Sequence, residues 1–284
     1  MKVILIFLGV FFIFLAIIAL LTKPSTIYNN NPSEKNPLEG KMVSLIEDEN
    51  DEENADGIKG HLIETGVIEY KYSFYEKYIK RLIDILLSYI GLVVLSPILL
   101  ITSIALYIND PGPIMFIQKR VGKNKQYFKL HKFRSMKMST PHDVPTHMLE
   151  NPEQYITSVG RFIRKTSLDE LPQIWDIFIG NMSIIGPRPG LWNQDLLTAE
   201  RDKYNANNVV PGLTGWAQIN GRDAITIQLK AKLDGIYTSK INKGGINAFI
   251  FDCKCFFGTF LAVLRSKDIV EGGTGEMHRH EGQR

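Results

Sequence analysis

A long apolar segment interrupted by a proline constrains this chain most. The segment from Leu82 to Ile108 is long and apolar enough to cross about 30 Å of hydrocarbon as a helix. Ser96 and Pro97 lie near the centre of this segment. Pro97 removes the hydrogen bond to the Val93 carbonyl and should bend the helix. Each arm is then roughly 20 Å long. The segment predicts either a re-entrant hairpin or a kinked spanning helix, with Ser96 or neighbouring protein satisfying the freed backbone groups.

Basic residues on both sides of this segment favour re-entry. They are Lys77, Lys80 and Arg81 before it, and Lys119, Arg120, Lys123 and Lys125 after it. Positive charge is enriched on the cytoplasmic side of membrane proteins. We therefore expect a re-entrant membrane hairpin over residues 71–110, with both ends in the cytoplasm.

A second apolar stretch lies at the N-terminus. Residues Val3 to Leu21 carry no charge and lie between Lys2 and Lys23. A cleaved signal peptide would have a shorter apolar core and small residues at the cleavage site, whereas Ile18 to Pro24 includes bulky residues there. We expect a retained transmembrane helix over residues 1–22.

The charge distribution separates an acidic segment from a basic remainder. Residues 23–70 contain four lysines and eleven acidic residues, so we expect a flexible, solvated linker. Residues 71–284 then carry a net charge of +9. This balance indicates anionic partners such as lipid headgroups or phosphorylated substrates. No nucleic-acid motif is present, so nucleic acid is not expected as a partner. Cys253 and Cys255 are expected to be free thiols facing a reducing cytosol.

Short apolar runs and helical periodicity organise the rest of the chain. Met115 to Val121 and Tyr127 to Phe133 predict a β-hairpin. Its basic side chains, including Lys132 and Arg134, could converge on phosphates or form a solvated strand face. Lys230 to Tyr237 and Ile246 to Leu264 predict helices. The second is apolar and aromatic, and core packing or a flat position on the membrane would explain it equally well.

The segment from Thr166 to Gly190 contains the residues best suited to phosphate chemistry. A helix beginning near Ser167 would hold the carboxylates of Asp169 and Glu170 in its first turn, where the positive dipole end favours ionised Asp and bound phosphate. The same residues form a capping box, which would explain them without chemistry. Arg188 stands between two prolines and could bind phosphate oxygens.

Seven motifs in order resemble one family. They are KRLID, the Ser-Pro break, DPGPIMFIQKRVG, KFRSM, SLDELPQ, GPRP and PGLTGWAQINGR. Together, over residues 75–267, they resemble the bacterial polyisoprenyl-phosphate hexose-1-phosphate transferases, or monotopic phosphoglycosyl transferases. The resemblance implies an α+β membrane-associated fold, with a small cytoplasmic α/β catalytic domain over residues 111–270 and interfacial helices. A disordered tail is expected over residues 271–284.

The resemblance also implies an activity. A sugar 1-phosphate passes from a UDP-sugar to undecaprenyl phosphate, UMP leaves, and the lipid diphosphate sugar initiates a surface glycan such as capsule or exopolysaccharide. Asp169 would be the nucleophile that forms a covalent phosphosugar intermediate, and Glu170 with Asp169 would hold Mg²⁺. The expected substrate contacts are Lys132, Arg134, Arg188 and Arg222.

The implied location is the bacterial cytoplasmic membrane, with the catalytic domain facing the cytoplasm. Inner-membrane lipids, downstream glycosyltransferases and a second copy of the chain are candidate partners. Two other interpretations stay open: a membrane-tethered scaffold without activity, and a glycosyltransferase that releases UDP. The segment Met1 to Glu69 departs from the family pattern, and neither the sugar nor the glycan pathway follows from the sequence.

Overall fold

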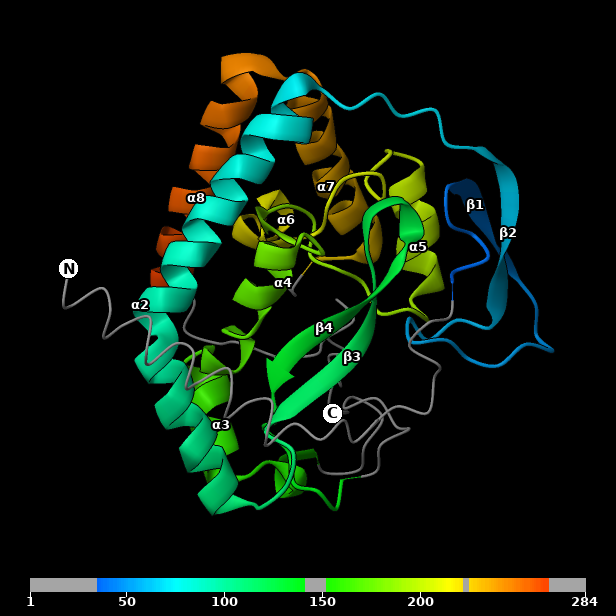
Figure 1. Cartoon of the computed structure of the whole chain (residues 1–284). Helices are drawn as coiled ribbons and strands as arrows, with labels where there is room; N and C mark the ends of the chain where they lie inside the picture. Colours follow the sequence, from blue (N-terminus) through cyan, green and yellow to red (C-terminus); the bar gives the residue numbers. More distant parts are fainter. Residues whose placement is uncertain (1–34, 141–151, 222–224, 266–284) are drawn as a thin grey trace, which may run out of the picture. The chain divides into compact units, whose positions relative to one another are not determined.

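The computed structural model of this chain describes residues 35–140, 152–221 and 225–265 (Figure 1). The expected helix over residues 1–22, the tail over 271–284 and Arg222 lie outside the described residues. The described chain forms two compact units. The first contains Arg81–Arg120 and Phe128–Met182, and the second contains Lys35–Lys80, Val121–Tyr127 and the chain from Ser183 onward. This division crosses the expected 111–270 domain, whose boundaries stay a prediction.

The first unit combines one long helix with a β-hairpin and shorter helices. Its elements are α2 (Lys80–Asn109), β3 (Met115–Val121), β4 (Tyr127–Phe133), η4 (Pro152–Tyr155), α3 (Ser158–Lys165), η5 (Leu168–Glu170) and α4 (Gln173–Ile179). The strands β3 and β4 pair with each other, which confirms the predicted hairpin with the expected bounds.

Helix α2 is continuous through its proline. Figure 1 shows it as one ribbon that changes direction partway along its length. The Ser96 hydroxyl donates to the Val93 carbonyl at 2.8 Å. This bond satisfies the carbonyl that Pro97 leaves without its usual donor, and it confirms the prediction for Ser96.

Both halves of α2 pack on the rest of the first unit. Near its start, Arg81 donates to the carbonyls of Ile177 and Phe178 at the end of α4, each at 2.7 Å. Near its end, Leu99 and Leu106 enter the core of this unit. The other buried members of that core are Ile114, Phe133 and Ile163. The folded unit therefore contacts the helix near both of its ends.

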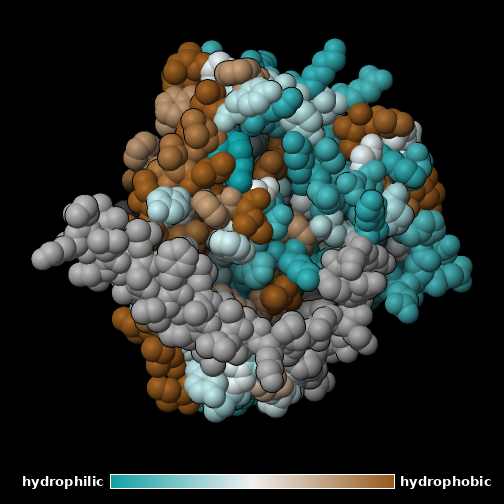
Figure 2. Space-filling view, in the orientation of Figure 1, coloured by the Kyte–Doolittle hydropathy of each residue, from teal (hydrophilic) through white to brown (hydrophobic). Residues whose placement is uncertain are grey.

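Two helical stretches are long and apolar enough to cross a membrane, namely Tyr75–Asn109 and Gly245–Ala262. Only 28% and 17% of their respective windows are buried, whereas the core helix of a soluble protein is mostly buried. Figure 2 shows apolar side chains gathered over α2. The most exposed of these are Leu82, Val94, Ile101 and Ile108. Both stretches are therefore candidate membrane helices.

The second unit contains the expected linker, which is folded where it is described. Strands β1 (Lys41–Glu47) and β2 (Gly60–Val67) form an antiparallel pair with an irregularity between Met42 and Val43. The Val43 N–H donates to Asp202 at 2.8 Å. A flexible linker was therefore the wrong expectation for residues 35–70. The acidic composition gave no sign of this hairpin, which is held by a residue far along the chain.

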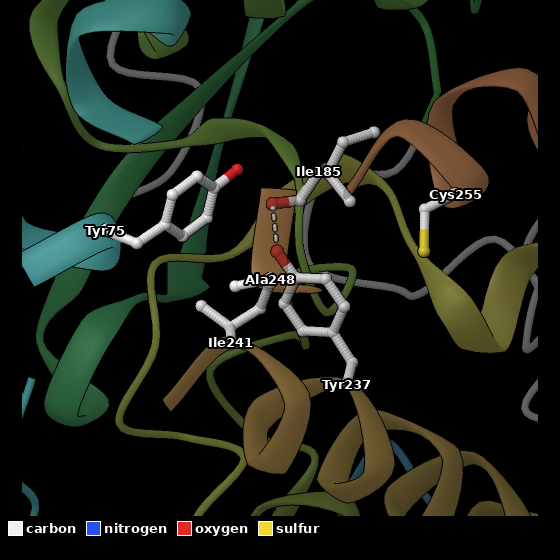
Figure 3. Close-up of a cluster of buried hydrophobic side chains, with 6 residues drawn as sticks. All are labelled: Tyr75, Ile185, Tyr237, Ile241, Ala248 and Cys255. Carbon is white, nitrogen blue, oxygen red and sulfur yellow. Dashed lines mark hydrogen bonds between the residues drawn. The ribbon is translucent and has the colours of Figure 1, made fainter. Parts of the chain in front are cut away.

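The second unit has further elements, some of which form one apolar cluster. They are η1 (Tyr75–Ile79), η2 (Lys123–Lys125), β5 (Ser183–Ile185), α5 (Asp195–Asp202), β6 (Gly212–Thr214), α6 (Trp216–Ile219), α7 (Ile227–Asn242) and α8 (Gly245–Arg265). Helices α7 and α8 confirm the two predicted helices and extend them. Figure 3 shows the cluster, in which the Tyr237 hydroxyl lies 3.0 Å from the Ile185 carbonyl oxygen.

Two of the basic residues that flank α2 lie in buried ion pairs. The Lys80 ammonium contacts Asp252 of α8 at 2.8 Å. The Lys125 ammonium contacts Asp202 at 2.8 Å and is fully buried. Neither cation is placed to face lipid headgroups, so the charge asymmetry around α2 is smaller than the sequence indicates.

Candidate active site

The Asp-Glu pair lies in a short 3-10 turn and not in the first turn of an α-helix. The turn η5 follows α3 closely, and α4 begins only at Gln173. Ser167 has a left-handed backbone (φ 54°), and its side chain makes no capping hydrogen bond. The expected capping box is therefore wrong. The physical reason is that Ser167 closes α3: its N–H donates to the Arg164 carbonyl at 3.0 Å, as at other helix C-termini.

The structure brings three predicted site residues together in the first unit. Asp169 is 3% exposed. The adjacent Glu170 accepts a hydrogen bond from the Lys132 ammonium at 3.2 Å, and both side chains are largely buried. Asp169 and Glu170 lie just before the N-terminus of α4 and not in its first turn. The charge of Lys132 also stabilises negative charge at the turn.

The neighbouring residue His131 holds Lys132 opposite the Asp-Glu turn. The backbone N–H of His131 donates to Asp176 at 2.9 Å, and the His131 ring nitrogen Nδ1 lies 2.8 Å from the other carboxylate oxygen. Asp176 belongs to α4 and is fully buried. This two-point contact joins β4 to α4, so it sets the spacing between Lys132 and Glu170.

Arg134 is buried and holds the loop that follows α2. Its guanidinium donates to the Asp110 carbonyl, and Nη2 lies 3.5 Å from the Asp110 carboxylate. Gly112 has φ +148°, and a β-carbon there would lie 2.7 Å from Arg134 Nη1. Burial lowers the pKa of Arg134 from its ordinary value, while Asp110 opposes the shift. Arg134 therefore holds this loop, and its expected contact with substrate stays a prediction.

Arg188 belongs to the second unit, where two predicted motifs meet. The Gly186 N–H donates to the Thr214 carbonyl at 2.7 Å, and the Gly212 N–H donates to the Pro187 carbonyl at 2.8 Å. A β-carbon at Gly212 would lie 2.1 Å from the Gly186 nitrogen. GPRP and PGLTGW thus require glycines at their contact, because the two backbones touch. Arg188 itself is half-buried.

The Asp-Glu turn offers oxygen donors that suit Mg²⁺. In the described parts of the chain, no group of three or more His, Cys, Asp or Glu side chains could hold a metal ion. Mg²⁺ bound with a diphosphate usually takes only one or two protein carboxylates and keeps several waters. Two adjacent carboxylates at one turn therefore fit a substrate-associated Mg²⁺, but they do not form a closed protein cage.

The sequence interpretation missed His131 and Asp176, although Asp176 carried a signal. It stands within QIWDIFI, a helix that is apolar apart from Gln173 and Asp176. A carboxylate in such a run is either exposed or paired inside the protein. The partner could not be identified, because it lies 45 residues away on another element.

Known proteins with similar sequences come from several bacteria. The chain is 40% identical over 151 residues to the UDP-glucose:undecaprenyl-phosphate glucose-1-phosphate transferase of Escherichia coli K12, covering 50% of this chain and 31% of that relative. It is 38% identical over 166 residues to the UDP-N-acetylgalactosamine-undecaprenyl-phosphate N-acetylgalactosaminephosphotransferase of Aeromonas hydrophila, covering 56% and 39%. The chain therefore spans about a third of the length of these two relatives.

A shorter relative is matched almost throughout. The uncharacterized sugar transferase EpsL of Bacillus subtilis is 37% identical over 193 residues, which cover 68% of this chain and 91% of EpsL. The family model described as bacterial sugar transferase matches residues 75–266. That match runs from η1 through α8 and includes the Asp-Glu turn, Lys132 and GPRP. The chain therefore belongs to the bacterial sugar transferase family.

Proposed function

We propose that this protein transfers a sugar 1-phosphate from a UDP-sugar to undecaprenyl phosphate and releases UMP. The observation that carries the proposal is the Lys132–Glu170 ion pair beside buried Asp169 in a member of this family. Phosphoryl transfer by covalent catalysis needs a nucleophile and nearby positive charge. The names of the relatives support both substrates. The lipid diphosphate sugar formed would begin a surface glycan such as capsule or exopolysaccharide.

Asp169 is the proposed nucleophile of two successive displacements. One carboxylate oxygen attacks the β-phosphorus of the UDP-sugar, the bond to the bridging oxygen breaks, and UMP leaves with the electron pair. An oxygen of undecaprenyl phosphate then attacks the same phosphorus, and the bond to Asp169 breaks to restore the carboxylate. Burial of Asp169 supports this assignment, because a site with little water protects an acyl phosphate from hydrolysis.

The neighbouring groups would stabilise the negative charge of the diphosphate. Lys132 would contact a non-bridging oxygen, and Arg188 would be a further substrate contact. Glu170, with Asp169, would hold Mg²⁺, which when bound neutralises charge on the diphosphate. Because Lys132 pairs with Glu170, the carboxylate is oriented before substrate arrives.

A re-entrant position of α2 fits the proposed reaction. The helix contacts one folded unit near both ends, through Arg81 and through Leu106. A spanning helix would separate its ends by about 30 Å of hydrocarbon, which a single folded unit could not follow. A helix that enters and leaves on the cytoplasmic side would hold the site at the depth of the lipid phosphate.

The test is UMP release by detergent-solubilised protein supplied with Mg²⁺, undecaprenyl phosphate and each of several UDP-sugars. The wild type is compared with Asp169→Asn and with the control Asp51→Asn, which lies in the β1–β2 segment. We expect UMP from the wild type and the control only. A phosphosugar adduct on the peptide that contains Asp169, detected by mass spectrometry without the lipid, would support the covalent intermediate.

Other outcomes would contradict the proposal. Release of UDP would identify a glycosyltransferase that transfers the sugar without its phosphate. No nucleotide product from a broad panel of UDP-sugars, with glycan assembly unaffected by Asp169→Asn in cells, would identify a scaffold. UMP release that survives Asp169→Asn would remove Asp169 as nucleophile and keep the overall reaction.

A further inference from the structure

Three carbonyl groups hold the segment that carries Arg188. Pro187 and Pro189 have no N–H to donate, so at these two positions the backbone can only accept hydrogen bonds. The Pro187 carbonyl accepts from Gly212 at 2.8 Å, and the Gly190 carbonyl accepts from Val121 at 3.0 Å. The central carbonyl, that of Arg188, accepts from Nη2 of the Arg201 side chain at 2.9 Å.

Arg201 is itself fixed by a buried carboxylate. Its Nε and Nη2 donate to one oxygen of Asp234, at 2.9 and 2.6 Å. Arg201 is 4% exposed and Asp234 is 1% exposed. Hydrogen bonds between charged groups are shorter and stronger than neutral ones, and the planar guanidinium directs its donors in fixed directions. Asp234 therefore orients the Arg201 side chain that holds the Arg188 carbonyl.

We propose that Arg201, oriented by Asp234, is a positioning residue that sets the direction of Arg188 toward the diphosphate of the UDP-sugar. The inference rests on the proposed function, because Arg188 is a substrate contact only if that function holds. The two prolines restrict the backbone on either side of Arg188, so a change at its carbonyl is transmitted to the side chain. Arg201 acts through Arg188 and does not touch the substrate.

The test is a double-mutant cycle on kcat/KM for the UDP-sugar. Arg201→Lys keeps a cation near Asp234 but lacks the forked donors that reach Arg188. We expect it to lower kcat/KM about 10- to 100-fold, as small displacements of positioning groups do. In an Arg188→Ala background the same substitution should have almost no further effect, because the group that it positions is absent. The matched control is Arg161→Lys, since Arg161 is 68% exposed.

If the losses of kcat/KM in the two single variants multiply in the double variant, the inference is overturned. Such a result would show an effect of Arg201 that is independent of Arg188. A second measurement does not depend on activity, so it also tests a variant that folds poorly. In hydrogen exchange, Arg201→Lys and Asp234→Asn should speed exchange at the amides of Gly212 and Val121, which donate to the Pro187 and Gly190 carbonyls, whereas Arg161→Lys should not. Unchanged exchange at these amides would also overturn the inference. Absence of UMP from the wild type would count instead against the proposed function.

Discussion

The carboxylate of Asp176 holds His131 at two points, through the backbone N–H at 2.9 Å and through the ring nitrogen Nδ1 at 2.8 Å. An ionised carboxylate only accepts hydrogen bonds, so this contact favours the His131 tautomer with hydrogen on Nδ1. The pair joins β4 to α4 inside the first unit. It therefore couples the position of Lys132 to that of the Asp-Glu turn.

Removing this carboxylate should destabilise the protein and its site together. Asp176→Ala leaves two donors of His131 in a partly buried place without their acceptor. A fully buried group left unsatisfied costs about 1–3 kcal/mol, so the loss should not exceed this range for each donor. We expect a lower midpoint of thermal unfolding in detergent and reduced UMP release. The control is Glu153→Gln, since Glu153 is 76% exposed. Equal midpoints for the two variants would refute a structural role for Asp176.

Replacing Lys132 should affect activity much more than stability. Lys132→Gln removes the charge 3.2 Å from Glu170 and leaves the strand intact. We expect UMP release to fall about 100- to 1000-fold, as when one stabilising donor is removed from an active site. Lys129→Gln is the matched control, because Lys129 lies on the same strand and is exposed. Similar rates for the two variants would exclude Lys132 from the site.

The contact between the β1–β2 segment and α5 should depend on pH through Asp195. Burial, and then the nearby Asp56 carboxylate, raise the pKa of Asp195 to about 6, while Asn54 and His61 oppose the shift. Burial also raises the pKa of Asp56, against hydrogen bonds from Leu197 and Gln194 and the charge of Lys230.

Since the folded pKa of Asp195 exceeds the unfolded value, this group favours the folded state below about pH 4. Its contribution is lost as the pH rises through about 6. Asp195→Asn should therefore stabilise the protein by about 1–2 kcal/mol at pH 8 and by little at pH 4. Thermal unfolding at the two pH values measures the difference. A stabilisation of equal size at both would contradict the shifted pKa.

The outer face of α8 should contact lipid. Phe257 is 64% exposed and Phe260 is 57% exposed, while Cys255 on the same helix is fully buried. A nitroxide label at Phe257→Cys in a Cys253→Ser background, in vesicles, should be accessible to oxygen and protected from a water-soluble relaxation agent. The control label is at Lys240→Cys, where the side chain is exposed on α7. Water accessibility at both sites would place α8 away from the membrane.

Local sequence patterns were enough for several elements. The β3–β4 hairpin has the expected bounds, because alternating short runs flank a turn and their partners are adjacent in the chain. Ser96 satisfies the carbonyl that Pro97 frees, because donor and acceptor are three residues apart. Helices α7 and α8 follow from periodicity. In each case the deciding interaction lies within a few residues.

Other expectations failed or stayed incomplete, because a neighbouring helix end or a distant contact decided the outcome. Ser167 matched a capping box, but the end of α3 immediately before it imposes a left-handed backbone. Residues 35–70 have the composition of a linker, yet β1 finds its partner Asp202 at a separation of 159 residues.

The sequence by itself determined the family, the candidate residues Asp169, Glu170 and Lys132, and the bend of α2 at Pro97, because ordered motifs and local backbone chemistry are readable along the chain. Only the tertiary structure decided that Lys132 lies against Glu170 and that Arg201 holds the Arg188 carbonyl. These contacts depend on how separate elements pack. Residue spacing along the chain carries no information about such packing.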